Sequence, residues 1–399
     1  MAAPVVTGER LERYAEVVVR VGANVQPGQE VFLYTNVEHA PLARALARQA
    51  YRAGASYVNV LHVDNHVRRA MIELGPDEAL TYSPEWMKDF VRCAEGGAVI
   101  ATTGDPEPEL LADLDGERVG RARTLEANEI ARRITSAKAV QWTVVASPGP
   151  GWAKQVFGEP DVERLWQQVA FCMRLDEDDP VGAWRQHLAR LDARAAALNE
   201  LRPDALLYRG PGTDLTVGLL PAARWVSVGF RTAGGTEYVA NMPSEEIFTS
   251  PDPLRADGTV RSTLPLALGG QIVVGLELTL EGGRIVRVDA ERGADVVRSE
   301  VATDDGASRL GELSLVTGDS RVGRSGTLFY DTLFDENATC HIAYGFGVPD
   351  AFDEDPGDDL NVSNVHTDFM VGGPELEVDA LLSDESTVPL IRNEEWQLT

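Results

Sequence analysis

The most constraining feature of this sequence is the alternation of strand and helix signals over its first 150 residues. Four apolar, β-rich runs occur there, at residues 30–34, 57–63, 98–102 and 139–145. Helical patterns separate them, one over 41–52 and one charged helix over 117–134. Such alternation joins parallel strands through crossover helices. We therefore predict an α/β fold whose N-terminal part contains an open, largely parallel sheet.

The pattern changes near residue 201. The stretch before this point is helical, with Trp184 and Leu191 on its apolar stripe. After it, short β-rich runs alternate with turns, which is typical of antiparallel sheet. We predict an N-terminal α/β domain at residues 1–201 and a C-terminal, mainly antiparallel α+β domain at residues 202–399.

Acidic side chains outnumber basic ones by 63 to 36, which gives a formal net charge of −27. A surface of this charge repels the phosphates of nucleic acids and of anionic lipids, so we expect neither as a partner. The sequence shows no apolar run of about 18 residues and no secretory signal pattern. We therefore expect a cytoplasmic protein. The three cysteines lack CxxC spacing, so we expect neither a disulfide framework nor a zinc finger.

Two segments resemble ligand-binding loops only superficially. The prolines of the segment 147–151 lack the N–H groups that would bind a phosphate, and no G-x-G-x-x-G motif follows a strand. The acidic stretch 353–359 contains Pro356 and lacks the ligand spacing of a calcium loop. We expect no nucleotide site in the first and a solvated loop in the second.

Four of the six histidines lie in the first half of the chain. His187 follows Arg185 and Gln186 in a charged helical segment, so we expect it on a solvated face. His39 stands at the start of a helix, where we expect a capping or packing role. His62 and His66 share a short polar segment, which we interpret as the end of a strand rather than as a metal site.

The second half contains acids and histidines beside apolar runs. His366 and Asp368 flank Thr367 just before an apolar run, and an HxD on a strand places both side chains on one face. Glu336 and His341 are five residues apart, which fits a loop or a strand end better than a helix face. Two further acidic positions stand at the heads of apolar runs, Glu245-Glu246 and Glu312. Each motif alone is compatible with solvated side chains.

Taken together, the segments 241–249, 329–341 and 361–372 resemble the motifs of the aminopeptidase T and aminopeptidase S family of two-metal aminopeptidases. The resemblance covers nearly the whole chain, including Glu38-His39-Ala40-Pro41-Leu42 and Arg209-Gly210-Pro211-Gly212-Thr213-Asp214. A single HxD is common, whereas this ordered set is specific. The resemblance implies a metal-dependent aminopeptidase that acts on peptides and forms a homodimer.

Carried over residue by residue, the resemblance implies a site for two divalent ions whose ligands are Glu246, Glu312, Glu336, His341, His366 and Asp368. Glu245 is the nearest rival of Glu246, because sequence alone does not separate adjacent acids. Glu312 and Glu336 are the bridging ligands that the resemblance implies, and Glu312 is also the proton acceptor when a metal-activated water attacks the scissile carbonyl. Oxygen-rich ligands with two imidazoles suit zinc, cobalt or manganese.

One departure from the family pattern concerns a tyrosine that family members carry seven residues after the histidine of the third motif. Here that position is Val348. Tyr344, three residues after His341, is a candidate for the catalytic hydroxyl, and a packing role is the alternative. The departure leaves open a dinuclear hydrolase of other amide substrates, such as N-acylated small molecules, and a catalytically impaired homologue that binds metal without turnover.

Overall fold

The computed structural model describes residues 8–268, 271–354 and 356–398. The chain divides into two compact units, which we call unit 1 (Met1–Arg185 and Gly229–Met242) and unit 2 (Gln186–Val228 and Pro243–Thr399). The chain enters unit 2 near the beginning of helix α9 (Pro180–Leu201), so the expected boundary at residue 201 lies within that unit. The domain limits themselves stay a prediction.

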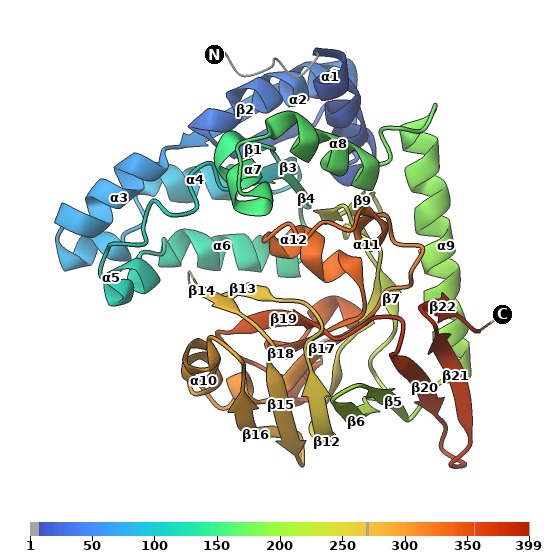
Figure 1. The fold of residues 1–399 in the computed structure, drawn as a ribbon. Coiled ribbons are helices and arrows are strands. Elements are labelled where there is room, and N and C mark those ends of the chain that lie inside the picture. The colour runs from blue at the N-terminus through green and yellow to red at the C-terminus, as the bar shows by residue number, and fades with distance from the viewer. Residues whose placement is uncertain (1–7, 269–270, 355, 399) are drawn as a thin grey trace. The chain divides into compact units, whose positions relative to one another are not determined.

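Unit 1 contains a five-stranded parallel sheet (Figure 1). In spatial order its strands are β2 (Tyr57–Val63), β1 (Glu30–Asn36), β3 (Ala98–Thr103), β4 (Gln141–Ala146) and β10 (Asn241–Met242). All four strand pairs are parallel, which confirms the predicted sheet. Three consecutive residues of β1, from Val31 to Leu33, are buried because parallel strands are covered on both faces. A separate two-stranded ribbon pairs β8 (Gly229–Arg231) with β9 (Glu237–Val239).

Helices connect these strands and continue beyond the sheet. They are α1 (Gly8–Val17), a π-helical turn (Val18–Gly22), α2 (Ala40–Arg52), α3 (Asn65–Leu74), α4 (Glu85–Cys93), α5 (Gly116–Arg121), α6 (Leu125–Ser136), α7 (Pro150–Phe157) and α8 (Val162–Cys172), with short 3₁₀ turns at Val37–His39 and Asp77–Leu80.

The single helix expected over 117–134 is wrong, because the chain forms two helices there. Arg123, between α5 and α6, donates its backbone N–H to the carbonyl of Leu80 at 2.9 Å instead of continuing a helical ladder. A new helix then begins after Thr124, whose carbonyl accepts from the N–H of Asn128. A tertiary hydrogen bond therefore overrides the local helical pattern.

Unit 2 is built on two antiparallel sheets, as the texture of the second half predicts. The five-stranded sheet has the order β19 (His366–Met370), β18 (His341–Gly345), β17 (Leu310–Leu315), β11 (Ile247–Thr249) and β7 (Val226–Ser227). The eight-stranded sheet has the order β16 (Arg284–Asp289), β15 (Glu277–Glu281), β12 (Pro251–Arg261), β6 (Thr213–Leu219), β5 (Ala205–Gly210), β20 (Glu377–Leu381), β21 (Thr387–Arg392) and β22 (Glu395–Trp396). Strands β13 (Leu266–Leu268) and β14 (Gln271–Val273) form a short ribbon.

The helices of unit 2 are short apart from α9. They are α10 (Ala294–Val301), α11 (Arg321–Ser325) and α12 (Thr332–Asp335), and 3₁₀ turns occur at Gly306–Ser308, Glu336–Ala338, Pro349–Ala351 and Gly357–Asp359. Every residue of β17 and of β18 is buried, so the centre of the five-stranded sheet lies in the core.

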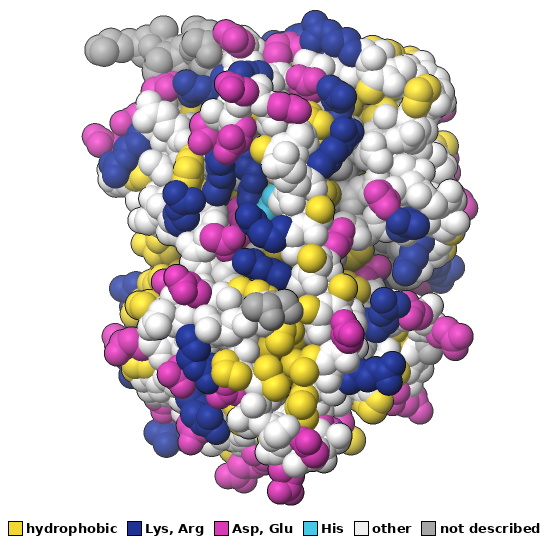
Figure 2. Space-filling model, turned by 90° about the vertical axis from the view of Figure 1, so that its right-hand side faces the viewer, with side chains coloured by type: hydrophobic (Ala, Val, Ile, Leu, Met, Phe, Trp, Pro, Cys, Tyr) yellow, Lys and Arg dark blue, Asp and Glu magenta, His cyan; other side chains and the backbone are white. Residues whose placement is uncertain are grey.

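Charged side chains of both signs cover the surface shown in Figure 2, where arginine and lysine are interspersed with aspartate and glutamate. Many charged side chains among the described residues form ion pairs, such as Arg255 with Asp204 at 2.5 Å and Arg10 with Glu163 at 2.8 Å. Exposed pairs of this kind contribute at most about 1 kcal/mol each. No helix within the described residues has both the length and the apolar character required to cross a membrane.

Candidate metal centre

The five-stranded sheet of unit 2 carries most of the residues that the sequence implies as metal ligands. Glu312 lies on β17, His341 begins β18, and His366 and Asp368 both lie on β19. Glu246 immediately precedes β11. Four neighbouring strands thus bring together side chains that are up to 122 positions apart (368 minus 246) in the sequence.

The strand register places these side chains on one face of the sheet. Glu312 pairs with Ala343, and Ala343 pairs with Asp368. His341 precedes Ala343 by two residues, and His366 precedes Asp368 by two. Residues two apart on a strand project to the same face, so all four ionisable side chains point the same way.

The distances confirm that the groups meet. The Nε2 atom of His341 lies 3.0 Å from Glu246 Oε2, and 4.0 Å from both Glu312 Oε1 and Asp368 Oδ1. The Nε2 atom of His366 lies 3.4 Å from Glu312 Oε2 and 3.6 Å from Asp368 Oδ2. Ser314, also on β17, donates from Oγ to Glu246 Oε2 at 2.5 Å.

Two sets of three side chains offer ligand atoms that all lie within 4.8 Å of one another. These sets are Glu246, Glu312 and His341, and Glu312, His366 and Asp368. Glu312 belongs to both sets. The arrangement is therefore one cluster with two adjacent centres rather than two separate sites.

The sixth residue, Glu336, begins the 3₁₀ turn that follows α12. Its side chain is buried, and burial raises the pKa of its carboxyl well above the usual value, with Asp368 and Glu246 adding to the increase. Glu336 belongs to neither of the two sets of three found among the described residues. Burial likewise raises the pKa of Glu312.

The acids around the two histidines raise the pKa of both imidazoles. Burial alone would lower the pKa of His341, but Glu246 and then Asp368 outweigh it and raise this pKa to about 10. His366 behaves in the same way, since Asp368 and Glu312 raise its pKa against the effect of burial. Both imidazoles are thus held by carboxylates, and the cluster favours positive charge in its centre.

The donor set fits divalent cations. The four carboxylates carry up to four negative charges, and Glu246, Glu312 and Asp368 form ion pairs with the two imidazoles. Buried like charges are costly unless a cation compensates them. The Nδ1 atom of His341 is buried and forms no hydrogen bond with the described residues. Carboxylate and imidazole groups are the ligands that zinc, cobalt and manganese accept.

A small cavity adjoins the cluster. It has a volume of about 110 Å³ and is lined in part by His366, Asp368 and Met370 of β19, together with Leu266 and Tyr330. The cluster is therefore reachable from a confined space rather than only from bulk water. A confined space of this size beside the acids can hold a small group of a substrate.

Comparisons with known proteins agree with this geometry. Residues 7–396 match a family model described as thermophilic metalloprotease, M29. This chain belongs to the M29 metalloprotease family. Membership means that the M29 protein works with a metal cofactor.

Named relatives of this M29 protein include aminopeptidase T of Thermus aquaticus, which is 41% identical over 402 residues and is matched over 97% of this chain and 98% of its own length. Aminopeptidase AmpS of Bacillus subtilis is 37% identical over 405 residues with the same coverage. The solved structure of wild-type AmpT from Thermus thermophilus superimposes with a TM-score of 0.90 at 38% identity, covering 97% of this chain and 99% of that one.

The structure does not bring Tyr344 into the metal cluster of this M29 protein. Tyr344 is three residues from His341 on β18, so its side chain projects to the opposite face of the sheet. Its hydroxyl donates to Glu300 Oε2 at 2.8 Å, and Thr367 donates to the same oxygen. Tyr344 is fully buried there. Whether it acts in catalysis or in packing stays a prediction.

The neighbouring acids Glu245 and Glu246 have different partners in the M29 structure. Glu246 approaches His341, whereas Glu245 Oε2 lies 3.4 Å from the Nε2 atom of His187. The geometry therefore favours Glu246 over Glu245 as the member of the cluster.

At the position of the family tyrosine, the backbone N–H of Val348 donates to Ser250 Oγ at 3.3 Å.

The expectation that His187 is solvated is wrong, because its side chain is buried with 5% exposure. The signal that indicates burial was present in the sequence. His187 is three residues after Trp184 and four before Leu191, so it continues the apolar stripe of α9. Ser314 and Asn337, which contact Glu246 and the residue before it, carried no sequence signal of their own.

Proposed function

We propose that two divalent metal ions, held by the six clustered residues, carry the metal-dependent aminopeptidase activity of this chain. The observation that supports two ions is the membership of Glu312 in both ligand sets, whose atoms lie within 4.8 Å of one another. One set would hold one ion and the second set the other, with Glu312 and Glu336 as bridges. Zinc, cobalt or manganese suit these ligands.

Two such ions supply Lewis-acid polarisation of a carbonyl and a water-derived nucleophile at neutral pH. The residues of the chain contribute the rest. His341 and His366 lie beside the acids and would bind the ions as neutral imidazoles. Glu312, whose pKa is raised by burial, is suited to accept a proton at a carboxylate oxygen and to release it again.

The proposed substrates are peptides with a free N-terminal amine. A free N-terminal amine in its neutral form offers a lone pair to a divalent ion, and the adjoining cavity of about 110 Å³ confines the group that enters. The nitrogen of an acetylated amine is an amide nitrogen, whose lone pair is not available in this way. We place the catalytic machinery in the C-terminal part of the chain, at residues 202–399, which contains all six proposed ligands.

The test is release of free amino acid from short peptides by metal-depleted protein, before and after zinc, cobalt or manganese is restored. Each peptide is supplied with a free and with an acetylated N-terminus. We expect activity to return with metal and only on the free peptides. Bound-metal analysis in parallel should give two ions per chain, and a stoichiometry of one would contradict the dinuclear proposal.

A second candidate is a dinuclear hydrolase of other amide substrates, and it is favoured by one observation. Val348 stands where the family pattern expects a tyrosine, and it offers no hydroxyl. This alternative predicts turnover of N-acylated small molecules with indifference to a blocked amine. Metal uptake without turnover of either class would instead identify a catalytically impaired homologue.

We also propose that the enzyme acts in the cytoplasm as a homodimer. Its net charge of −27 disfavours association with nucleic acid or with anionic membranes. Sedimentation equilibrium of the full chain tests the oligomeric state, where a mass near twice 43.3 kDa is expected. Fractionation of the source cells tests the compartment.

A further inference from the structure

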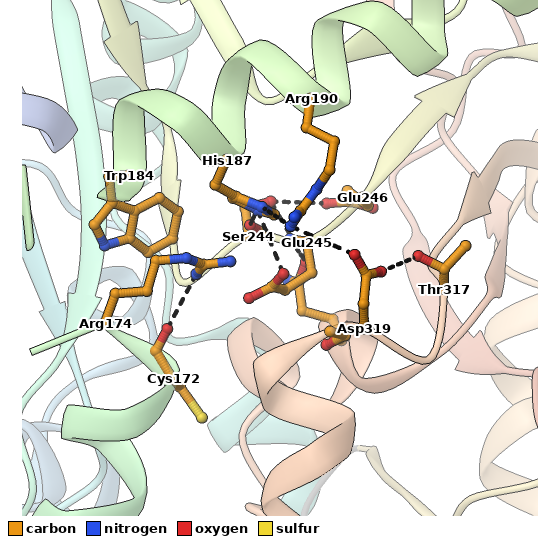
Figure 3. Close-up of polar contacts among 12 residues, drawn as sticks. Cys172, Arg174, Trp184, His187, Arg190, Ser244, Glu245, Glu246, Thr317 and Asp319 are labelled. Atoms are coloured by element: carbon orange, nitrogen blue, oxygen red, sulfur yellow. Dashed lines mark hydrogen bonds and ion pairs between the residues drawn. The ribbon is translucent and has the colours of Figure 1, made fainter. Parts of the chain in front are cut away.

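We propose that His187 is a positioning residue that fixes Glu246 in the metal centre by holding the peptide group that precedes it. The inference rests on the proposed function, because it assigns to His187 a role toward the proposed ions. His187 lies on α9, far in sequence from the six clustered residues. Figure 3 shows how it points toward the segment that contains Ser244, Glu245 and Glu246.

The peptide group between Ser244 and Glu245 is held at both ends. The Nε2 atom of His187 lies 2.9 Å from the carbonyl oxygen of Ser244. The backbone N–H of Glu245 donates to Asn337 Oδ1 at 2.7 Å. Carbonyl and N–H belong to one planar unit, so these two contacts fix its orientation. This plane fixes the backbone nitrogen of Glu245, and Glu246 is attached through that residue.

The tautomer of His187 is determined by its neighbours. Arg190, one turn later on α9, places its NH2 atom 2.9 Å from Nδ1 of the imidazole. Because a guanidinium only donates hydrogen bonds, Nδ1 must be the acceptor and carries no proton. The proton is then on Nε2, where it is donated to the Ser244 carbonyl. His187 is therefore a neutral imidazole with a defined donor.

Further contacts hold this donor in place. Arg190 forms an ion pair with Asp319 at 3.5 Å (Figure 3). Arg194 contacts the same carboxylate at 3.5 Å. Asp319 also accepts a hydrogen bond from Thr317. The next residue, Ser320, donates to the backbone carbonyl of Asn337 at 2.6 Å.

These contacts form a closed ring of hydrogen bonds and ion pairs. The ring runs from His187 through the Ser244–Glu245 peptide group to Asn337, and returns through the loop 317–320 and Arg190. Its members adjoin ligand-bearing segments, since Asn337 follows Glu336 and the loop follows β17. Buried carboxylates repel one another when no ion is present, so such a ring is needed to keep Glu246 in its place.

The experiment compares zinc binding by the full-length protein and three variants. His187→Phe removes both ring nitrogens at similar volume, whereas His187→Gln retains an amide donor that can reach the Ser244 carbonyl. His39→Phe is the matched control. His39 is also buried, with 2% exposure, and its imidazole is also bonded through both nitrogens, to Thr102 and Gly104, but it lies in unit 1.

Zinc dissociation constants are measured by competition with a chromogenic chelator on metal-depleted protein, and the melting temperature of each metal-free variant is recorded. We expect His187→Phe to raise at least one of the dissociation constants by about 10- to 100-fold. His187→Gln should stay within about threefold of the wild type. His39→Phe should lower the melting temperature and leave zinc affinity unchanged.

Wild-type affinity in folded His187→Phe would overturn the inference, and so would an equal loss in His39→Phe. If His187→Phe does not fold, Arg190→Met replaces it, since the Arg190 side chain is 49% exposed. Its loss removes the partner of Nδ1 and the ion pair of Arg190 with Asp319, to which Arg194 still binds. A weaker zinc affinity in Arg190→Met supports the inference, and an unchanged one overturns it. Failure of the wild type to bind zinc would instead reject the proposed function.

Discussion

Ala343 lies directly opposite Asp368 where β18 pairs with β19, and directly opposite Glu312 where β18 pairs with β17. Directly opposed residues have Cβ atoms about 4.5–5.5 Å apart and share a face of the sheet. The methyl group of Ala343 is thus the smallest side chain in a row of acids. A larger side chain at this position would enter the space between the two acids.

Ala343→Leu should therefore fill the space between Glu312 and Asp368 and prevent metal uptake. Overpacking at a fully buried position costs about 1–3 kcal/mol of unfolding free energy, so the chain should still fold. Bound zinc per chain is measured after dialysis, with Ala343→Gly as the variant that leaves the space open. Full metal content in the leucine variant would show that this row does not border the ions.

A second prediction concerns the energetic cost of the cluster in the metal-free protein. Burial, Asp368 and Glu246 raise the pKa of Glu336 above that of the unfolded chain, so folding retains a proton that the unfolded state releases. The free energy of unfolding of the metal-free protein then falls as pH rises above about 4.5, by about 1.4 kcal/mol for each unit of raised pKa.

Glu336→Gln removes this ionisation. At pH 8 we expect the metal-free variant to be more stable than metal-free wild type, and zinc to stabilise the variant less than it stabilises the wild type. Thermal unfolding of both proteins, each with and without zinc, gives the four stabilities to be compared. A metal-free variant that is less stable than the wild type would mean that Glu336 is held by favourable contacts rather than strained by its neighbours.

Local patterns predicted the parallel sheet well, because each strand there is a short apolar run between helical segments. The strand at 57–63 has the observed limits of β2. The break between α5 and α6 could not be predicted in this way, since it depends on the carbonyl of Leu80, more than 40 positions earlier. Contacts between distant segments decide such boundaries.

In the candidate site, too, local patterns predicted some features, whereas others depend on contacts between distant segments. The spacing of His366 and Asp368 correctly indicated a shared strand face. The convergence of Glu246 and Glu312 with them follows from strand register, which no local pattern reports. The opposite orientation of Tyr344 did follow from strand alternation, three positions after His341, once β18 was known.

A third prediction tests the role of Tyr344. Its hydroxyl donates to Glu300 on the face away from the cluster, so Tyr344→Phe should leave kcat and KM for a peptide within about twofold of the wild type while lowering the free energy of unfolding by about 1.5–3 kcal/mol. Urea unfolding and steady-state kinetics are measured on the same preparation. A large fall in kcat with unchanged stability would return Tyr344 to the list of catalytic residues.

A fourth prediction concerns the pH dependence of stability in unit 1. Burial lowers the pKa of His39 below its usual 6.5, and its Nε2 atom lies 3.0 Å from the acceptor-only carbonyl of Gly104, which makes it a neutral donor. Below pH 6.5 the unfolded chain therefore binds a proton that the folded chain resists. Stability should fall as pH decreases from about 7 to 5, with a slope of at most about 1.4 kcal/mol per pH unit from this group.

His39→Gln should make that slope shallower, as measured by urea unfolding at several pH values on metal-depleted protein. His66 supplies a control of opposite sign, because its hydrogen bond with Glu107 raises its pKa. The contribution of His66 to the free energy of unfolding is complete below the pKa of this histidine in the unfolded chain, and it is lost as pH rises through the pKa in the folded chain. This contribution therefore opposes the loss of stability at low pH. His66→Gln removes it, so stability should fall slightly more steeply as pH decreases. Identical slopes in wild type and His39→Gln would show that protonation of His39 does not limit stability in acid.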